Sequence, residues 1–172
     1  MIGLLRKRHS VRKYTSHPIP ADKIDILKES LLRSPTSRNF RPWRFIFVDD
    51  RELLNSLSNS KMSGSSLIKG AALGVVVCGD ESISDIWIED CSIASILLQM
   101  TAQSIGLGSC WVQIRNRHTA QGTSSEEYVK KVLGIPEHIR VESIIAIGFP
   151  AEKKEPAKLE NLPADRFHNN GW

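Results

Sequence analysis

The stretch from residue 86 to residue 105 constrains the fold more than any other part of the chain. Its apolar side chains cover more than one stripe of a helix, namely Ile88, Cys91, Ile93, Ala94, Ile96, Leu97, Leu98, Met100, Ala102 and Ile105. A helix that is apolar nearly all round is a central, buried one. Gly106 follows, and glycine is typical of the position just after a helix. We therefore predict a central helix over 86–105, apolar on more faces than one small domain can cover.

The remaining elements mix strands and helices without a regular alternation. Apolar runs predict strands over 44–48, 71–78, 108–114 and 141–149, and amphipathic spacing predicts helices over 2–8 and 125–133, after Pro20 and after Asp50. No G-x-G-x-x-G run follows the first strand, which argues against a dinucleotide-binding βαβ sheet. We expect an α+β fold of three layers, in which residues 1–172 form one domain and residues 150–172 form a tail without a core pattern.

Composition favours some classes of function over others. The formal net charge of +4 suits a small anionic ligand better than a long polyanion such as nucleic acid. The three cysteines (Cys78, Cys91 and Cys110) are odd in number and form no C-x-x-C pair, so we expect a reduced, cytoplasmic protein without disulfides. No histidine spacing resembles a metal site. No apolar run approaches ~18 residues and no apolar segment backs the charged N-terminus, so we expect neither a membrane span nor a secretory signal.

A basic N-terminal segment carries the clearest candidate site. The five residues Arg8-His9-Ser10-Val11-Arg12 place two arginines around a serine hydroxyl. In an extended backbone alternate side chains point to one side, so Arg8, Ser10 and Arg12 would form a row of donors for a phosphate or another anionic oxygen. The plainer alternative is a solvated basic run, which is the usual state of short charge clusters near a terminus.

Other residues with chemical potential are weaker candidates. Residues 34–43 read as a loop dense in hydroxyl and amide groups, with prolines that stiffen it. Cys110 could act as a nucleophile beside a histidine, but a structural cysteine in a strand is the better interpretation. Glu89 and Asp90 read as a solvated helix patch rather than as an acid–base pair. The chain thus offers anion-binding groups without hydrolytic machinery, which favours chemistry carried by a bound cofactor.

Several motifs, taken in order, resemble the signatures of the nitroreductase family. They are Arg8-His9-Ser10-Val11-Arg12-Lys13-Tyr14, Pro35-Thr36-Ser37-Arg38-Asn39-Phe40-Arg41-Pro42-Trp43, Gly106-Leu107-Gly108-Ser109-Cys110-Trp111, Leu133-Gly134-Ile135-Pro136 and Ile147-Gly148-Phe149-Pro150. Their order and spacing match across nearly the whole chain. The resemblance implies a three-layer α+β fold with a central, mostly antiparallel sheet flanked by helices. It also implies an intertwined homodimer in which residues 150–172 wrap the partner subunit.

The resemblance further implies FMN, bound without covalent attachment between two subunits. Arg8 and Ser10 would hold its phosphate and ribityl end. Arg12 would lie near the flavin N1 and O2 atoms, where a cation stabilises charge on the reduced ring, so Arg12 is the expected catalytic residue. The second subunit would contribute the loop that contains Thr36 and Asn39. The implied cofactor-binding set is Arg8, His9, Ser10, Arg12, Pro35, Thr36, Ser37, Asn39, Ser109, Cys110, Trp111, Lys153 and Lys154.

By this resemblance the chain is expected to be an NAD(P)H-dependent oxidoreductase. NADH or NADPH would reduce FMN by hydride transfer and leave, and an electron-poor acceptor such as a nitroaromatic or a quinone would then enter the same pocket. Arg41 and Gln113 stand where glutamine and glycine are common in the family, and both could alter that pocket. Two other functions stay open at this point. One is a nucleic-acid-binding module, and the other is a flavin protein that stores, senses or fragments FMN without an outside acceptor.

Overall fold

A four-stranded antiparallel sheet forms the middle of the molecule, which we describe from a computed structural model of residues 1–172. Its strands are β1 (Trp43–Val48), β2 (Leu73–Asp80), β3 (Gly108–Gln113) and β4 (Ile139–Gly148), in the order β1-β2-β4-β3. Every neighbouring pair is antiparallel. The most continuous apolar runs of the sequence belong to β2 and β4, the two inner strands, because both faces of an inner strand are covered here.

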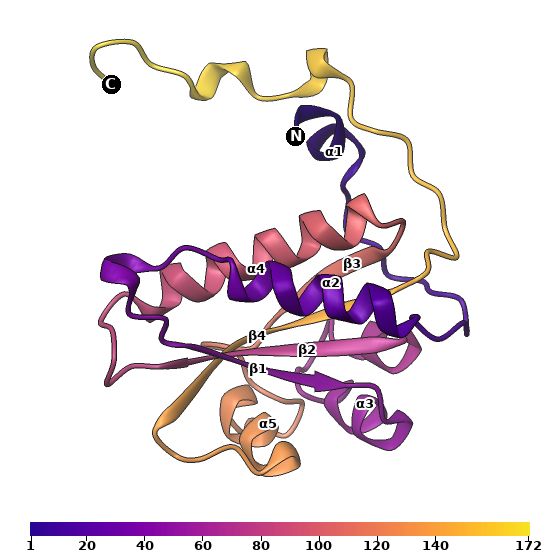
Figure 1. Cartoon of the computed structure of the whole chain (residues 1–172), viewed down its shortest axis with the longest axis vertical. Helices are drawn as coiled ribbons and strands as arrows, with labels where there is room; N and C mark the ends of the chain where they lie inside the picture. The colour runs from indigo at the N-terminus through magenta and orange to yellow at the C-terminus, as the bar shows by residue number, and fades with distance from the viewer.

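Helices cover both faces of this sheet and make three layers (Figure 1). α2 (Ala21–Leu32) and α4 (Trp87–Ser104) lie on one face, and α3 (Arg51–Leu57) and α5 (Ser125–Leu133) lie on the other. A separate apolar cluster fills each of the two interfaces. The predicted α+β fold, with an antiparallel sheet between helices, is confirmed. None of the helices combines the length and the apolar character that a membrane crossing requires.

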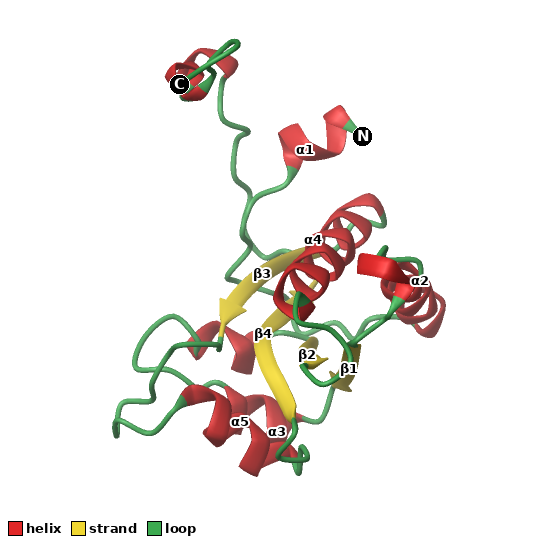
Figure 2. Cartoon of the chain, turned by 90° about the vertical axis from the view of Figure 1, so that its left-hand side faces the viewer, coloured by secondary structure: helices red, strands yellow, loops and turns green.

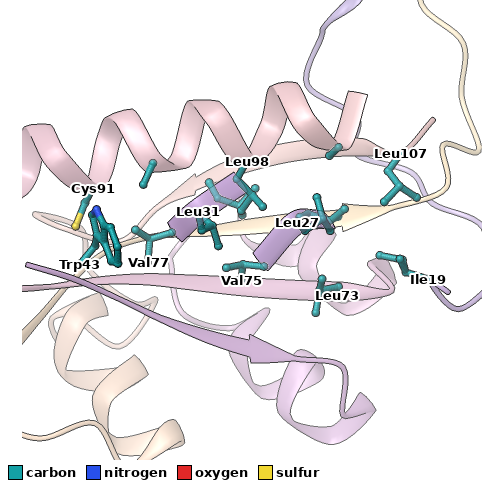
Figure 3. Packing of buried hydrophobic residues seen from close by; sticks show 14 of the residues in the cluster. Ile19, Leu27, Leu31, Trp43, Leu73, Val75, Val77, Cys91, Leu98 and Leu107 are labelled. Carbon is teal, nitrogen blue, oxygen red and sulfur yellow. The ribbon is translucent and has the colours of Figure 1, made fainter. Parts of the chain in front are cut away.

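α4 supplies much of the core on its face of the sheet, as Figure 3 shows. Its inner side chains pack against Leu27 and Leu31 of α2 and against the apolar residues of β2 and β4. Its outer face is also apolar, yet Ile93 and Ile96 each remain 40% exposed. As the sequence predicts, this helix is apolar on more faces than its own chain covers.

The two ends of the chain stand away from this body (Figure 2). α1 (Ile2–Lys7) is a single short helix with no buried residue. Residues 151–172 contain only two 3₁₀ turns, Leu159–Asn161 and Ala164–Arg166. Phe167 is 83% exposed and Trp172 is fully exposed. The tail therefore leaves large apolar side chains in solvent, at a cost that a partner surface would remove.

A β-bulge in β4 places one carboxyl group inside the core. Val77 pairs with Ser143 and Cys78 pairs with Val141, so Glu142 is the extra residue between them. Glu142 is 2% exposed, and its carboxylate accepts a hydrogen bond of 2.6 Å from the Ser92 hydroxyl of α4. Burial raises the pKa of Glu142 to about 7, against the opposing effects of the Ser92 bond and of Arg115.

We predict that Glu142 makes stability depend on pH. Because its pKa is higher in the folded chain than the ordinary value of 4.5, the folded state holds the proton more tightly. The free energy of unfolding should therefore fall as the pH rises from about 4.5 through 7, by on the order of 3 kcal/mol. Urea unfolding of Glu142→Gln should lack this fall, whereas the exposed-site variant Glu137→Gln should keep it. A wild-type curve that is flat between these pH values would contradict the assignment.

Candidate functional site

The N-terminal segment that follows α1 lies against the edge strand β3. Ser10 forms a parallel bridge with Ser109, and the Val11 N–H donates to the Ser109 carbonyl at 2.9 Å. Val11 is 1% exposed and packs directly over Gly108, where a Cβ atom would lie 2.7 Å from Val11 Cγ2. Only glycine lets the Val11 side chain pack this close to the strand. The turned-in Val11 leaves Ser10 and Arg12 on the outer side, as an extended segment requires.

Tyr14 fastens the other end of this segment to the sheet. Its hydroxyl lies 2.7 Å from the Val11 carbonyl and 3.1 Å from the Ala146 carbonyl of β4, and its proton can be given to either. Burial raises the pKa of Tyr14 far above its ordinary value, so the phenol stays protonated and can donate. The Ala151 N–H also donates to the Lys13 carbonyl at 2.9 Å. The segment is thus fixed from both sides, and its basic side chains project from a rigid backbone.

A cavity of about 460 Å³ opens where this segment, α1 and the start of the tail meet. Arg8, His9, Ser10, Arg12 and Lys154 all line it. The ring atom His9 Nε2 is buried without a hydrogen-bond partner. The Nδ1 atom of the same ring lies 3.1 Å from the Lys7 carbonyl and donates to it, so Nε2 of the neutral ring is an acceptor. The guanidinium and ammonium groups of Arg8, Arg12 and Lys154, with the Ser10 hydroxyl, form a donor set suited to a phosphate, and Arg6 and Lys7 line the same cavity.

The tail contributes unequally to this cavity. The Glu152 carboxylate accepts a hydrogen bond of 2.7 Å from the Arg12 backbone N–H, and this bond lowers the pKa of Glu152. Lys154 lies in the same cavity as Arg8 and Arg12, whereas Lys153 lines only a neighbouring hollow. Of the two lysines named from the sequence, the structure brings Lys154 to the other basic residues.

The predicted residues of β3 also meet the N-terminal segment. Ser109 and Cys110 are buried, and Trp111 is half-buried with its Nε1 donating to Gln113 Oε1 at 2.9 Å. Burial raises the pKa of the Cys110 thiol, although Arg12 and a bond with Ser10 oppose the rise. The thiol is therefore held protonated, which agrees with a structural cysteine rather than a nucleophile.

The second predicted loop lies elsewhere in the same chain. The Ser37 N–H donates to Asp90 Oδ1 at 2.9 Å, which anchors the loop near the start of α4. From Asp90 the helix runs on to Ser104, about 21 Å away at 1.5 Å per residue, before the chain reaches Gly108. Within one chain the structure therefore does not bring Pro35, Thr36, Ser37 and Asn39 to Arg8. Asp90 itself is 2% exposed, so the interpretation as a solvated patch is wrong for this residue.

The two departures from the family pattern are both tied into local networks. The Arg41 backbone N–H donates to Thr36 Oγ1 at 3.0 Å, and Arg41 Nε donates to Asn39 Oδ1 at 3.0 Å. The Gln113 side chain bridges Trp111 Nε1 and the Arg115 carbonyl. Each therefore orients a predicted site residue beside it in the chain.

Lys61 is a residue whose surroundings the sequence does not indicate. Burial lowers its pKa, nearby Arg117 lowers it further, and Cys110 acts in the opposite direction. The following residue, Met62, donates its N–H to the His118 carbonyl at 2.9 Å, which holds the serine- and glycine-rich loop against the end of β3. The sequence carries no signal for this placement, because the Met62–His118 bond that holds the loop joins segments far apart in the chain.

Known proteins and solved structures resemble this chain over its whole length. The family model described as the nitroreductase family matches residues 5–87 and 59–149. A Methanothermobacter thermautotrophicus protein, provisionally described as an NADH dehydrogenase/NAD(P)H nitroreductase, is 32% identical over all of this chain and 87% of its own length. A similarly described Archaeoglobus fulgidus protein is 30% identical over 99% of this chain and 98% of its own length.

The solved structures agree with the sequence comparisons. A Clostridium difficile structure described as an FMN-dependent nitroreductase superposes with a TM-score of 0.97, at 38% identity over 100% of both chains. A Parabacteroides distasonis structure superposes with a TM-score of 0.90, at 34% identity over 99% of this chain and 98% of the other.

We predict that Gly108→Ala loosens the N-terminal segment. The added Cβ would overlap the Val11 side chain, and such overpacking costs about 1–3 kcal/mol of unfolding free energy. Amide hydrogen exchange of residues 8–14 should rise with it. Gly70→Ala is the matched control, because a Cβ there meets no atom within 4 Å. Equal stability and equal exchange in the two variants would show that the contact does not hold the segment.

Proposed function

Because the chain belongs to the nitroreductase family, we propose that it is an FMN-dependent oxidoreductase that uses NADH or NADPH to reduce a small electron-poor acceptor, such as a nitroaromatic or a quinone. The observation that carries this proposal is the cavity in which Arg8, Ser10, Arg12 and Lys154 converge. The bound flavin would supply hydride and electron transfer, which no side chain of this site can perform. The nicotinamide donor and the acceptor would use the site in turn.

The residues present fit FMN on structural grounds. The cavity volume lies in the range of ordinary ligand sites, which is about 300–1,000 Å³. The phosphate of FMN is an anion, and the lining offers several cationic donors. Charge-assisted bonds of this kind contribute roughly 1.5–3 kcal/mol each. A few of them are enough to hold a cofactor without a covalent bond.

The basic residues of the cavity would have different tasks. Arg8, Ser10 and Lys154 would bind the phosphate and ribityl end. Arg12 is held separately, since its backbone N–H is bonded to Glu152 and its guanidinium lies 3.4 Å from the Ser10 carbonyl. We assign Arg12 the role of stabilising the negative charge that develops on the ring during reduction. Ser109, Cys110 and Trp111 would form the wall beside the ring.

The site would be completed by a second copy of the chain. Pro35, Thr36, Ser37 and Asn39 lie near the start of α4, whereas the segment with Arg8 lies against β3, beyond the other end of that helix. The exposed Ile93 and Ile96 of α4, together with Phe167 and Trp172 of the tail, offer the apolar surface that a permanent dimer buries. Two-fold symmetry would then form two identical sites, each with one loop from each subunit.

We predict that substitution of Arg8 mainly weakens FMN binding, whereas substitution of Arg12 mainly slows flavin reduction. The wild-type protein should purify yellow and release FMN on denaturation. Arg8→Ala should raise the FMN dissociation constant about tenfold or more, because its partner is charged before the reaction starts. Arg12→Ala, saturated with FMN, should instead be reduced by NADH or NADPH about 10–100-fold more slowly in stopped-flow measurements, because its partner charge forms during the reaction. Arg33→Ala, at the exposed end of α2, is the control.

Two results would contradict these roles. A colourless wild-type protein that takes up no added FMN would refute the proposed function. Equal reduction rates in the two FMN-saturated arginine variants would refute the division of roles between Arg8 and Arg12.

We also predict that the tail holds the dimer together. A chain ending at Pro156 keeps Lys154 but loses the exposed apolar residues of the tail, so it should become monomeric and lose most of its FMN. Light scattering and flavin content measure the two effects. The full-length double variant Phe167→Ser/Trp172→Ser should weaken the dimer as well, because it removes the apolar contact without shortening the chain. A truncated protein that stays dimeric and yellow would exclude the wrapped tail.

A further inference from the structure

The turn formed by residues 36–41 has an unusual backbone. Three of its non-glycine residues have positive φ angles, namely Arg38 at 49°, Asn39 at 58° and Arg41 at 51°. This left-handed region is disfavoured for any residue with a Cβ atom. Such conformations persist only where the surroundings fix them, and they gather at functional sites.

A buried carboxylate connects this turn to the core. Asp90, in the first turns of α4, accepts the Ser37 N–H at 2.9 Å and is 2% exposed. The bonds from Arg41 to Thr36 and Asn39 lie inside the turn and shape it, but they cannot place it on the molecule. The Arg38–Asp85 ion pair reaches another element but is exposed on both sides, and such pairs are weak. Asp90 is therefore the contact that sets the position of the turn relative to α4.

The surroundings of the turn contain buried polar groups that lower the stability of the fold. Three buried polar atoms there have no hydrogen-bond partner: Ser34 Oγ, Trp43 Nε1 and Asp90 Oδ2. Ser34 and Trp43 closely flank the turn on its two sides. Each unpaired buried group destabilises the folded state, and a buried carboxylate does so most. Their concentration around one strained turn indicates that its geometry serves function rather than folding.

We propose that Asp90 is a positioning residue that holds the 36–41 turn in the conformation in which it meets the FMN of the partner subunit. The inference rests on the proposed function. Asp90 does not touch the cofactor and acts through the Ser37 backbone. The Asp90 carboxylate lies in the first turn of α4, where the helix dipole favours an anion. A turn fixed in advance binds with less loss of chain entropy than one that must order on binding.

The experiment compares three variants by two readouts. Asp90→Ala removes the acceptor, Asp90→Asn keeps a carbonyl oxygen that can accept the Ser37 N–H, and Asp85→Ala removes the exposed partner of Arg38. The first readout is amide hydrogen exchange of residues 36–41 in the flavin-free protein. It should rise about tenfold or more in Asp90→Ala and much less in Asp90→Asn, and it should stay at the wild-type level in Asp85→Ala. The second readout is the FMN dissociation constant, which should follow the same order.

A further variant covers the case in which Asp90→Ala does not fold. Ser37→Pro deletes the same N–H from the other side, and the preceding Thr36 already has the extended backbone that a proline requires of its predecessor. Exchange of residues 38–41 should rise in this variant too.

The outcomes separate this inference from the function on which it rests. A wild-type protein that takes up no FMN would overturn the proposed function. An Asp90→Ala protein with wild-type exchange in the turn and wild-type FMN affinity would overturn only the role of Asp90. Losses of equal size in Asp90→Asn and Asp90→Ala would also overturn it, since the hydrogen-bond acceptor would then not be what matters.

Discussion

The packing of α4 on the central strands is the constraint on which the rest of the molecule depends. Its inner face closes the larger apolar cluster together with α2, β2 and β4. Its two ends then decide where the functional segments lie. Asp90, near the start, holds the 36–41 turn, and the chain leaving the far end enters β3 at Gly108. α4 thus connects the two parts of the proposed site, with the 36–41 turn near its start and the β3 segment beyond its end.

At the β3 end, two side chains of the N-terminal segment pack directly on glycine backbones of the sheet. Val11 lies over Gly108, and Tyr14 lies over Gly148, where a Cβ would come within 2.9 Å of the tyrosine ring. The basic side chains of the N-terminal segment therefore project from a backbone that is bonded into the sheet. Rigid support of this kind lets a set of like charges stay together before an anion arrives, at an electrostatic cost that the anion offsets.

Most of the fold follows from local patterns in the sequence, and the exceptions share one cause. The apolar runs of β2 and β4 and the long helix are properties of neighbouring residues, and they predict the elements to within a few positions. The bulge at Glu142 depends on register with β2, which no local pattern contains. Burial of Asp90 depends on Ser37, a partner 53 positions away in the chain. The motif residues of the site can be named from the sequence. The surroundings of Lys61, and the fact that Lys154 rather than Lys153 lines the basic cavity, depend on how distant segments meet in the fold.

The length of α4 has a consequence for how such a chain can change. In the proposed dimer, α4 sets the distance between the 36–41 turn, which contributes to one flavin site, and the segment on β3, which contributes to the other site. Adding one residue would advance the helix by about 1.5 Å and turn everything beyond it by about 100°. Substitutions on its surface are tolerable, but insertions and deletions would misalign both sites at once. The number of residues in α4 should therefore vary far less among functional relatives than the lengths of the surface loops.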